Sequence, residues 1–269
     1  MPSLLEIGIE AQRFLPGILT TWLTKGYCNE MGKSRRLEDK LKFAKEYKIN
    51  WRQTRKYRKG DTLETCLAKF PTLNSFFARE IDDSLTKPST TNPNAIVSPA
   101  YCYARRLQNA TNGTFDIKGA PYTLETLVRR PIQEAAVYIF RLAPHHYHRI
   151  HSPIQGTIKS IESVGGHYRS VNPILLDTIP VLQQNYRKII TFTNGIILVA
   201  IGATAVGSIN LTVHRGFKVE HGQDIGDFQF GGSCLALIVP HPLRLLRPSP
   251  KFTVQERDCS VGDYIGLFA

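Results

Sequence analysis

From Ile96 onward the sequence consists of short apolar runs, rich in β-branched and aromatic residues, that are separated by Gly, Pro and Asn. Runs of this length with turn residues between them are typical of antiparallel strands, because longer helices would need uninterrupted 3.6-residue periodicity. The sequence therefore predicts a mainly antiparallel β-domain over residues 95–269. The expected strands are Ala136–Leu142, Gly156–Val164, Lys188–Thr193, Ile196–Ile201, Ser208–Val213 and Leu235–Val239, with one short helix at Tyr122–Arg129.

The first 86 residues have a different pattern. Apolar residues between Leu4 and Leu23 recur with helical spacing that Pro16-Gly17 interrupts, which predicts two short amphipathic helices. A basic amphipathic helix is expected between Leu37 and Ile49, and the polar, Pro-containing stretch Lys87–Asn94 is expected to be a linker. The predicted fold class is α+β, with a helical region at residues 1–86 ahead of the β-domain.

Length and cysteine content restrict the class of protein. A chain of 269 residues can bury a substantial core without disulfides. Its five cysteines are scattered, odd in number and contain no Cys-x-x-Cys pair, which favours a reducing compartment over a disulfide framework or a zinc site. A membrane-spanning helix is not expected, because the longest strongly apolar stretch, Ile196–Val206, is about half of the roughly 20 residues that a span needs. A secretory signal peptide is not expected either, because the first apolar segment carries Glu6 and Glu10 and no basic region precedes a small-residue cleavage site.

The net charge of +12 indicates a polyanionic partner. Residues 33–60 hold twelve Lys or Arg against three acidic residues, so nine of the twelve net charges lie there. Phe43, Tyr47 and Trp51 lie close by, which is the composition of a helix in a lipid interface, with anionic headgroups against the basic face. The alternative is a solvated basic face whose apolar stripe packs on the protein. Nucleic acid is not expected, because no nucleic-acid-binding motif is present.

Four histidines lie close together in the sequence, at His145, His146, His148 and His151. Imidazoles at such spacing can ligate a metal, but no cysteine or carboxylate pattern supports one, and no metal is expected. Loop histidines without a chemical role are the second alternative. Proton transfer fits better, because histidine titrates near neutrality and can serve as a general base toward a hydroxyl.

A glycine pair precedes Ser233, in the order Phe230-Gly231-Gly232-Ser233-Cys234, and an apolar run follows. Two glycines permit a tight, strained backbone that presents a serine hydroxyl to the preceding carbonyl. Alone, the pattern is more typical of an ordinary turn before a strand.

Taken together and in order, these segments resemble the phosphatidylserine decarboxylase family, which uses a self-generated pyruvoyl group. The resemblance covers roughly residues 60 to 240. It rests on the segments Asn74–Glu80, Phe140–Pro144, Tyr147–Gly156, Ser170–Pro173, Val199–Ile209 and Gly222–Ser233.

The resemblance implies a mechanism. His151 would activate Ser233, whose hydroxyl attacks the carbonyl of Gly232, so that the chain is cut into a β-chain of residues 1–232 and an α-chain of residues 233–269. Ser233 would become a pyruvoyl group that draws electrons from the substrate carboxylate bond during decarboxylation. His148 would recognise and protonate the substrate, and Tyr147 and Asn172 would contribute to substrate binding.

The implied activity converts phosphatidylserine to phosphatidylethanolamine on an anionic phospholipid membrane, by a peripheral protein that is capable of forming a homodimer. Two alternatives stay open. One is an uncut lipid-binding pseudoenzyme, and the other is a pyruvoyl-dependent decarboxylase of a soluble amino acid.

One departure from the family pattern concerns the residue that orients the histidine. The family generally has Ser-Pro-Ala-Asp-Gly, whereas this chain has Ser98-Pro99-Ala100-Tyr101-Cys102, with Tyr101 in place of the Asp. No acidic residue lies within ten positions of Tyr101. Tyr101 itself, or Asp116 or Asp177 from elsewhere, is a candidate to replace the missing carboxylate.

Overall fold

The computed structural model describes residues 9–16, 26, 30–107, 110–203, 208–231 and 233–269. Most of the segment Leu4–Leu23, for which two helices are expected, lies outside the described residues. In chain order the helical region contains α3 (Leu37–Glu46), η1 (Trp51–Gln53), α4 (Leu63–Ala68), α5 (Leu73–Phe77) and η2 (Asp83–Leu85). Threonines at the N-caps of α4 and α5 accept backbone N–H bonds and explain where these short helices begin.

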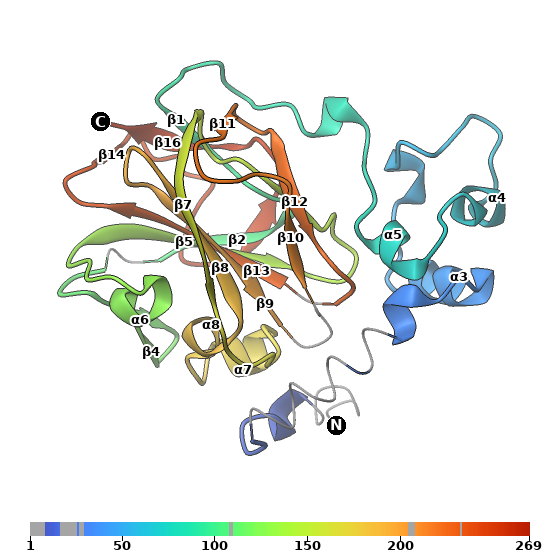
Figure 1. Cartoon of the computed structure of the whole chain (residues 1–269), viewed down its shortest axis with the longest axis horizontal. Helices are drawn as coiled ribbons and strands as arrows, with labels where there is room; N and C mark the ends of the chain where they lie inside the picture. The colour runs from blue at the N-terminus through green and yellow to red at the C-terminus, as the bar shows by residue number, and fades with distance from the viewer. Residues whose placement is uncertain (1–8, 17–25, 27–29, 108–109, 204–207, 232) are drawn as a thin grey trace.

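The β-rich region begins at Ala95 and alternates strands with three short helices (Figure 1). Its first half contains β1 (Ala95–Val97), β2 (Cys102–Arg106), β3 (Thr114–Ile117), β4 (Ala120–Thr123), α6 (Leu124–Val128), β5 (Ala135–Leu142), β6 (Arg149–His151) and β7 (Gly156–Val164). Its second half contains α7 (Pro173–Leu176), α8 (Val181–Gln184), β8 (Arg187–Phe192), β9 (Ile197–Gly202), β10 (Ile209–Leu211), β11 (Lys218–Val219), β12 (Asp224–Phe228), β13 (Ser233–Pro240), β14 (Leu245–Leu246), β15 (Arg257–Cys259) and β16 (Tyr264–Phe268).

Eight strands form one antiparallel sheet in the order β11-β7-β8-β9-β13-β5-β2-β15. Two three-stranded sheets, β1-β16-β14 and β10-β12-β6, and the hairpin β3-β4 complete the region. The predicted α+β class with antiparallel strands is confirmed, and each of the six expected strands overlaps an observed one. The expected helix at Tyr122–Arg129 is shorter than predicted, because Tyr122 and Thr123 end β4 and the helix covers Leu124–Val128.

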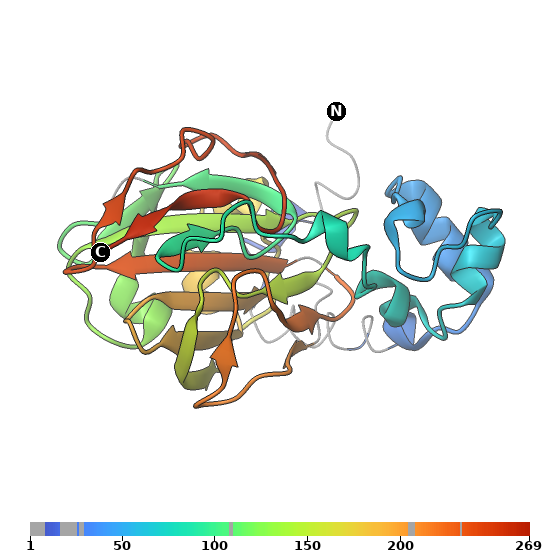
Figure 2. The same ribbon diagram turned by 90° about the horizontal axis from the view of Figure 1, so that it is seen from above.

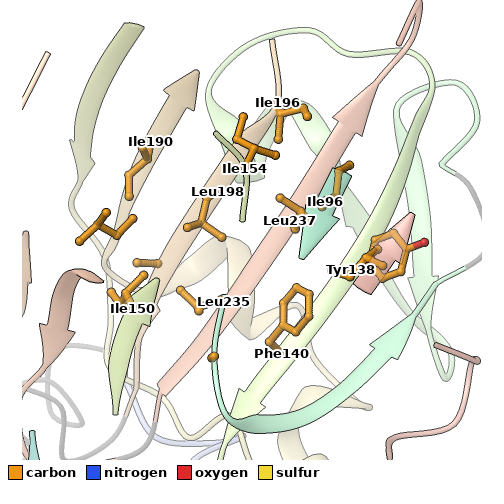
Figure 3. Packing of buried hydrophobic residues seen from close by; sticks show 14 of the residues in the cluster. Ile96, Tyr138, Phe140, Ile150, Ile154, Ile190, Ile196, Leu198, Leu235 and Leu237 are labelled. Atoms are coloured by element: carbon orange, nitrogen blue, oxygen red, sulfur yellow. The ribbon is translucent and has the colours of Figure 1, made fainter. Parts of the chain in front are cut away.

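β13 is central to the large sheet, between β5 and β9, and seven of its eight residues are buried. Leu235 and Leu237 face one core together with Tyr138 and Phe140 (Figure 3). Cys234, Ala236 and Ile238 face a second core on the opposite side of the sheet. A strand buried on both faces explains why residues 233–239 are apolar without alternation after Ser233.

The helices α3, α4 and α5 lie at one end of the molecule and pack around their own cluster of aromatic residues (Figure 2). Phe43, Ala44 and Ile49 are buried there, and Leu37, Leu41, Tyr47 and Trp51 pack against them. The apolar stripe of the basic helix therefore packs on the protein, which is the second of the two alternatives. Of the twelve basic residues in the range 33–60, eleven are exposed and only Lys40 is buried.

Phe230 connects this helical cluster to the large sheet. Its ring lies 5.3 Å from that of Phe43 and 5.4 Å from that of Phe77, centroid to centroid, and its backbone N–H donates to Asn74 Oδ1 at 2.9 Å. The chain then passes through the glycine pair into β13. The helical region is thus in contact with the segment immediately before Ser233.

Candidate active site at Ser233

Ser233 is the first residue of the central strand, where it is paired with Leu142 of β5 and Gly202 of β9. The serine is fully buried. Gly231 has φ of +135°, a conformation that favours glycine, whereas Gly232 lies outside the described residues. The chain thus enters β13 through a turn that needs a glycine at position 231.

The side chain next to the Ser233 hydroxyl is that of His148. The distance from Oγ to Nδ1 of His148 is 3.1 Å, and the other ring nitrogen, Nε2, lies 3.0 Å from the carbonyl oxygen of Ala143. A carbonyl oxygen only accepts, so Nε2 carries the proton and Nδ1 accepts from the serine hydroxyl. This tautomer is the one that a general base toward Ser233 requires.

The surroundings of His148 keep its imidazole neutral. Burial lowers its pKa well below the usual value, and the positive charge of Arg79 acts in the same direction, while the hydrogen bond to Ala143 opposes them. Phe77 stacks on the ring, with centroids 3.9 Å apart and planes inclined by 26°. At physiological pH the imidazole is therefore neutral and its Nδ1 lone pair accepts the hydrogen bond from Ser233, while the same lowered pKa makes it a weaker base than an exposed histidine.

His151 makes two other contacts. Its Nδ1 lies 2.7 Å from the carbonyl oxygen of Gly222, and its Nε2 lies 3.1 Å from the hydroxyl of Tyr147. The Gly222 carbonyl accepts from Nδ1–H, so the Tyr147 hydroxyl donates to Nε2. The resemblance assigns activation of Ser233 to His151, but in the uncut chain the histidine within reach of the serine hydroxyl is His148. The chemical roles of both histidines stay predictions.

The candidates for the missing carboxylate lie elsewhere. Tyr101 packs with Ile81, Tyr147 and Val261, and its ring lies 5.2 Å from that of His146. Asp177 forms ion pairs with Arg105 and Lys118 at 3.1 and 2.8 Å. Asp116 Oδ1 accepts from the backbone N–H of Gly119 at 2.6 Å. In place of a carboxylate, backbone carbonyls orient the two histidines.

Asn172 caps the first turn of α7, with its Oδ1 accepting from the N–H of Ile174 at 3.0 Å. This bond gives the side chain a structural role in the uncut chain. Its predicted role in substrate binding stays a prediction.

Tyr147 and His151 line a cavity of about 350 Å³ between the helical region and the β-region. Its wall carries charges of both signs: Arg55, Arg149, Glu80, Asp83 and Asp224. A cavity with this lining suits a small ligand that itself carries both charges.

Three features of the site were not predicted from the sequence: the Ala143 carbonyl, the ring of Phe77 and the guanidinium of Arg79. Phe77 and Arg79 belong to the segment Asn74–Glu80 that carries part of the resemblance, which is the signal that pointed to them. A backbone acceptor such as the Ala143 carbonyl has no sequence signal, because every residue provides one.

The fold and the site together define an antiparallel β-protein with a buried serine, in contact with a neutral histidine, at the start of its central strand. The sequence profile of the family described as phosphatidylserine decarboxylase matches residues 73–266. The chain belongs to the phosphatidylserine decarboxylase family.

Several members of this family are similar to the chain. It is 34% identical over 243 residues to the phosphatidylserine decarboxylase proenzyme of Anoxybacillus flavithermus, covering 84% of both chains. It is 31% identical over 223 residues to that of Clostridium novyi, covering 78% of this chain and 71% of the relative. It is 33% identical over 204 residues to proenzyme 2 of Komagataella phaffii, where the match covers 69% of this chain but only 20% of the longer fungal protein. The chain spans about a fifth of the length of such fungal relatives.

No helix among the described residues is long and apolar enough to cross a membrane.

Proposed function

We propose that this chain cuts itself between Gly232 and Ser233 and then converts phosphatidylserine to phosphatidylethanolamine and carbon dioxide. The observation that carries the proposal is the buried contact between the Ser233 hydroxyl and Nδ1 of a neutral His148, in a member of this family. The similar relatives are proenzymes by name, which supports self-processing of this chain.

The cut begins with proton transfer from Ser233 Oγ to Nδ1 of His148, as Oγ attacks the carbonyl carbon of Gly232. The Oγ–C bond forms, the peptide C–N bond breaks, and His148 returns the proton to the nitrogen of Ser233, leaving an ester. Loss of the Cα proton of Ser233 then eliminates the Gly232 carboxylate and leaves a dehydroalanine. Water converts the latter to a pyruvoyl group and ammonia. In the uncut chain the Ala143 carbonyl holds His148 in the tautomer that can accept the Ser233 proton.

The surroundings of Ser233 fit such a group, since its side chain is fully buried and faces an uncharged imidazole. The pyruvoyl carbonyl supplies the electron sink for decarboxylation. His148 would return a proton, from its Nδ1, to the substrate carbon that loses carbon dioxide. The cavity of about 350 Å³ that Tyr147 and His151 line would take up the serine headgroup, which carries both signs of charge as the lining does. Ser233 and His148 are not among the residues that line this cavity.

The two products of the cut are expected to stay together. β13 belongs to the 233–269 chain, but its neighbours β5 and β9 belong to the 1–232 chain and pair with it along its length. Separation would expose Leu235, Leu237 and Ile238, which are fully buried, and each such side chain contributes about 1.5–3 kcal/mol.

Denaturing mass spectrometry of the purified protein tests the proposal. Two chains are expected, of residues 1–232 and 233–269, the second beginning with a pyruvoyl group, together with release of phosphatidylethanolamine from phosphatidylserine vesicles. Ser233→Ala is expected to stay a single chain. A single uncut wild-type chain would refute the proposal and leave the lipid-binding pseudoenzyme. Two chains that act only on a soluble amino acid would leave the other alternative.

We also propose that the exposed basic residues of the range 33–60 hold the protein on anionic membranes as a peripheral protein. Since the apolar stripe of α3 is buried, attachment would be mainly electrostatic, with up to about 1 kcal/mol for each basic residue near the surface. Sedimentation with phosphatidylserine vesicles is expected to decline steeply between about 0.05 and 0.5 M salt, because salt screens exposed charges increasingly over this range. Binding that does not change with salt would contradict this attachment.

A further inference from the structure

Arg79 is a buried cation beside the candidate active site. Its side chain is 5% exposed, and it takes part in none of the ion pairs among the described residues. Buried arginines usually have a carboxylate partner, because an unpaired charge in the interior is costly. A cation without such a partner at this position calls for a reason.

The contacts of Arg79 lead to His148. Its Nη2 donates to the carbonyl oxygens of His145 and His146, at 3.2 and 3.3 Å. These residues belong to a turn in which the N–H of His146 donates to the Ala143 oxygen at 2.9 Å and the N–H of Ala143 donates to Nδ1 of His146 at 3.0 Å. The same Ala143 oxygen accepts from Nε2 of His148. Arg79 thus holds the turn whose carbonyl orients the base.

Arg79 is also the permanent charge that faces His148. The other titratable groups around this imidazole are His145 and His146, from its own segment, and the Ser233 hydroxyl. Burial lowers the pKa of both histidines, to about 3 for His146, so they are neutral near pH 7. Burial lowers the pKa of Arg79 only to about 10, so it remains protonated.

We propose that Arg79 is a positioning residue for self-cleavage, which fixes the turn whose carbonyl orients His148 toward Ser233. This inference rests on the proposed function. When His148 accepts the Ser233 proton, an imidazolium forms beside a guanidinium. Their repulsion favours onward transfer of that proton to the nitrogen of Ser233, as the bond to Gly232 breaks.

Two substitutions test the charge of Arg79 separately from its hydrogen bonds to the turn. Arg79→Gln removes the charge and keeps a donor for the carbonyls, whereas Arg79→Lys keeps the charge and loses the planar fork. Arg187 provides a matched control, since it is 2% exposed, donates only to backbone carbonyls and also has its pKa lowered by burial to about 10. Among the described residues, none of the hydrogen bonds of Arg187 involves Ser233 or His148.

The readout is the rate of self-cleavage of freshly synthesised full-length chain from pH 8 down to the lowest pH at which the chain stays folded, together with the melting temperature. Arg79→Gln is expected to move the acid limb of the rate profile upward on the order of one pH unit, as loss of a nearby unit charge predicts. Arg79→Lys is expected to keep the acid limb of the wild-type rate profile. It is also expected to cut at least about fivefold more slowly than Arg187→Lys, because it loses one charged hydrogen bond.

The inference would be overturned if Arg79→Gln left the acid limb unchanged and slowed cleavage no more than Arg187→Gln does at an equal loss of melting temperature. If Arg79→Gln does not fold, the comparison of Arg79→Lys with Arg187→Lys decides, and equal cleavage rates would overturn it. A wild-type chain that is never cut would instead refute the proposed function, so the two failures are distinguishable.

Discussion

Phe77 offers a test of whether the helical region supports the chemistry at Ser233. It is the last residue of α5, is fully buried, and stacks on His148 while contacting Phe43 and Phe230. Phe77→Leu keeps most of the buried apolar volume but removes the ring that covers the imidazole. Phe70→Leu is the matched control, because Phe70 is 2% exposed in the same aromatic cluster and packs on Phe76.

The magnitudes follow from the packing. Replacing one buried ring by a smaller aliphatic side chain is expected to cost about 1–2 kcal/mol of unfolding free energy in either variant. An aromatic stack contributes about 0.5–1.5 kcal/mol beyond buried area, so loss of the stack on His148 is expected to slow cleavage about 2- to 12-fold in Phe77→Leu alone.

The assay follows the uncut fraction on denaturing gels after cell-free synthesis is stopped, at a temperature where both variants are folded. Urea unfolding of each variant in the Ser233→Ala background gives the stability loss. Equal slowing in Phe70→Leu and Phe77→Leu would refute the reasoning, because it would mean that cleavage responds to general stability and not to the contact with His148.

Three further predictions concern the neighbouring tyrosines and histidines. Tyr147→Phe is expected to change the cleavage rate less than twofold, because Tyr147 contacts His151, and to lower the unfolding free energy by about 1–3 kcal/mol in urea, since His151 Nε2 loses its buried donor; a cleavage loss as large as that of His148→Ala would contradict this. Tyr101→Asp is expected not to accelerate cleavage at pH 6 on the same gels, and a tenfold acceleration would show that the missing carboxylate limits the rate. His146 has a folded pKa of about 3, below its unfolded value, so the unfolded state binds more protons and stability is lost as the pH falls below about 6.5. Uncut Ser233→Ala chain is expected to lose about 2 kcal/mol less between pH 7 and 5 when His146→Gln is added, and identical pH dependence would exclude His146 as a source.

The strands were predictable because their signal is local. Gly156–Val164 matches β7 at both ends, and Leu235–Val239 lies within β13, since turn residues and apolar runs set strand limits without reference to the rest of the fold. What the apolar stripe of α3 packs against was not predictable. The helix that carries Phe43 and Ala44 is amphipathic whether this stripe faces protein or lipid, and only the positions of α4 and α5 decide that it is buried in protein.

At the site, the residue types were predictable and their pairing was not. His148 and His151 lie three residues apart, and which of them reaches Ser233 depends on the backbone path from the turn at Ala143–His146 into β6. That path also determines which carbonyl each imidazole meets, Ala143 for one and Gly222 for the other. Such contacts join residues up to 71 positions apart and have no local pattern.

The residues at positions 101 and 79 together influence the charge around His148. Tyr101 lies close enough to Arg79 for the two side chains to interact electrostatically, so a carboxylate at position 101 would give the guanidinium a negative neighbour. That negative charge would offset the effect of Arg79 on His148 and raise the pKa of the imidazole. Tyr101 provides no such carboxylate, and in its place the Ala143 carbonyl accepts the hydrogen bond that orients His148. We therefore expect a histidine that burial and a nearby cation keep neutral, and that the backbone orients, to serve as the base for a serine that must lose its proton only once.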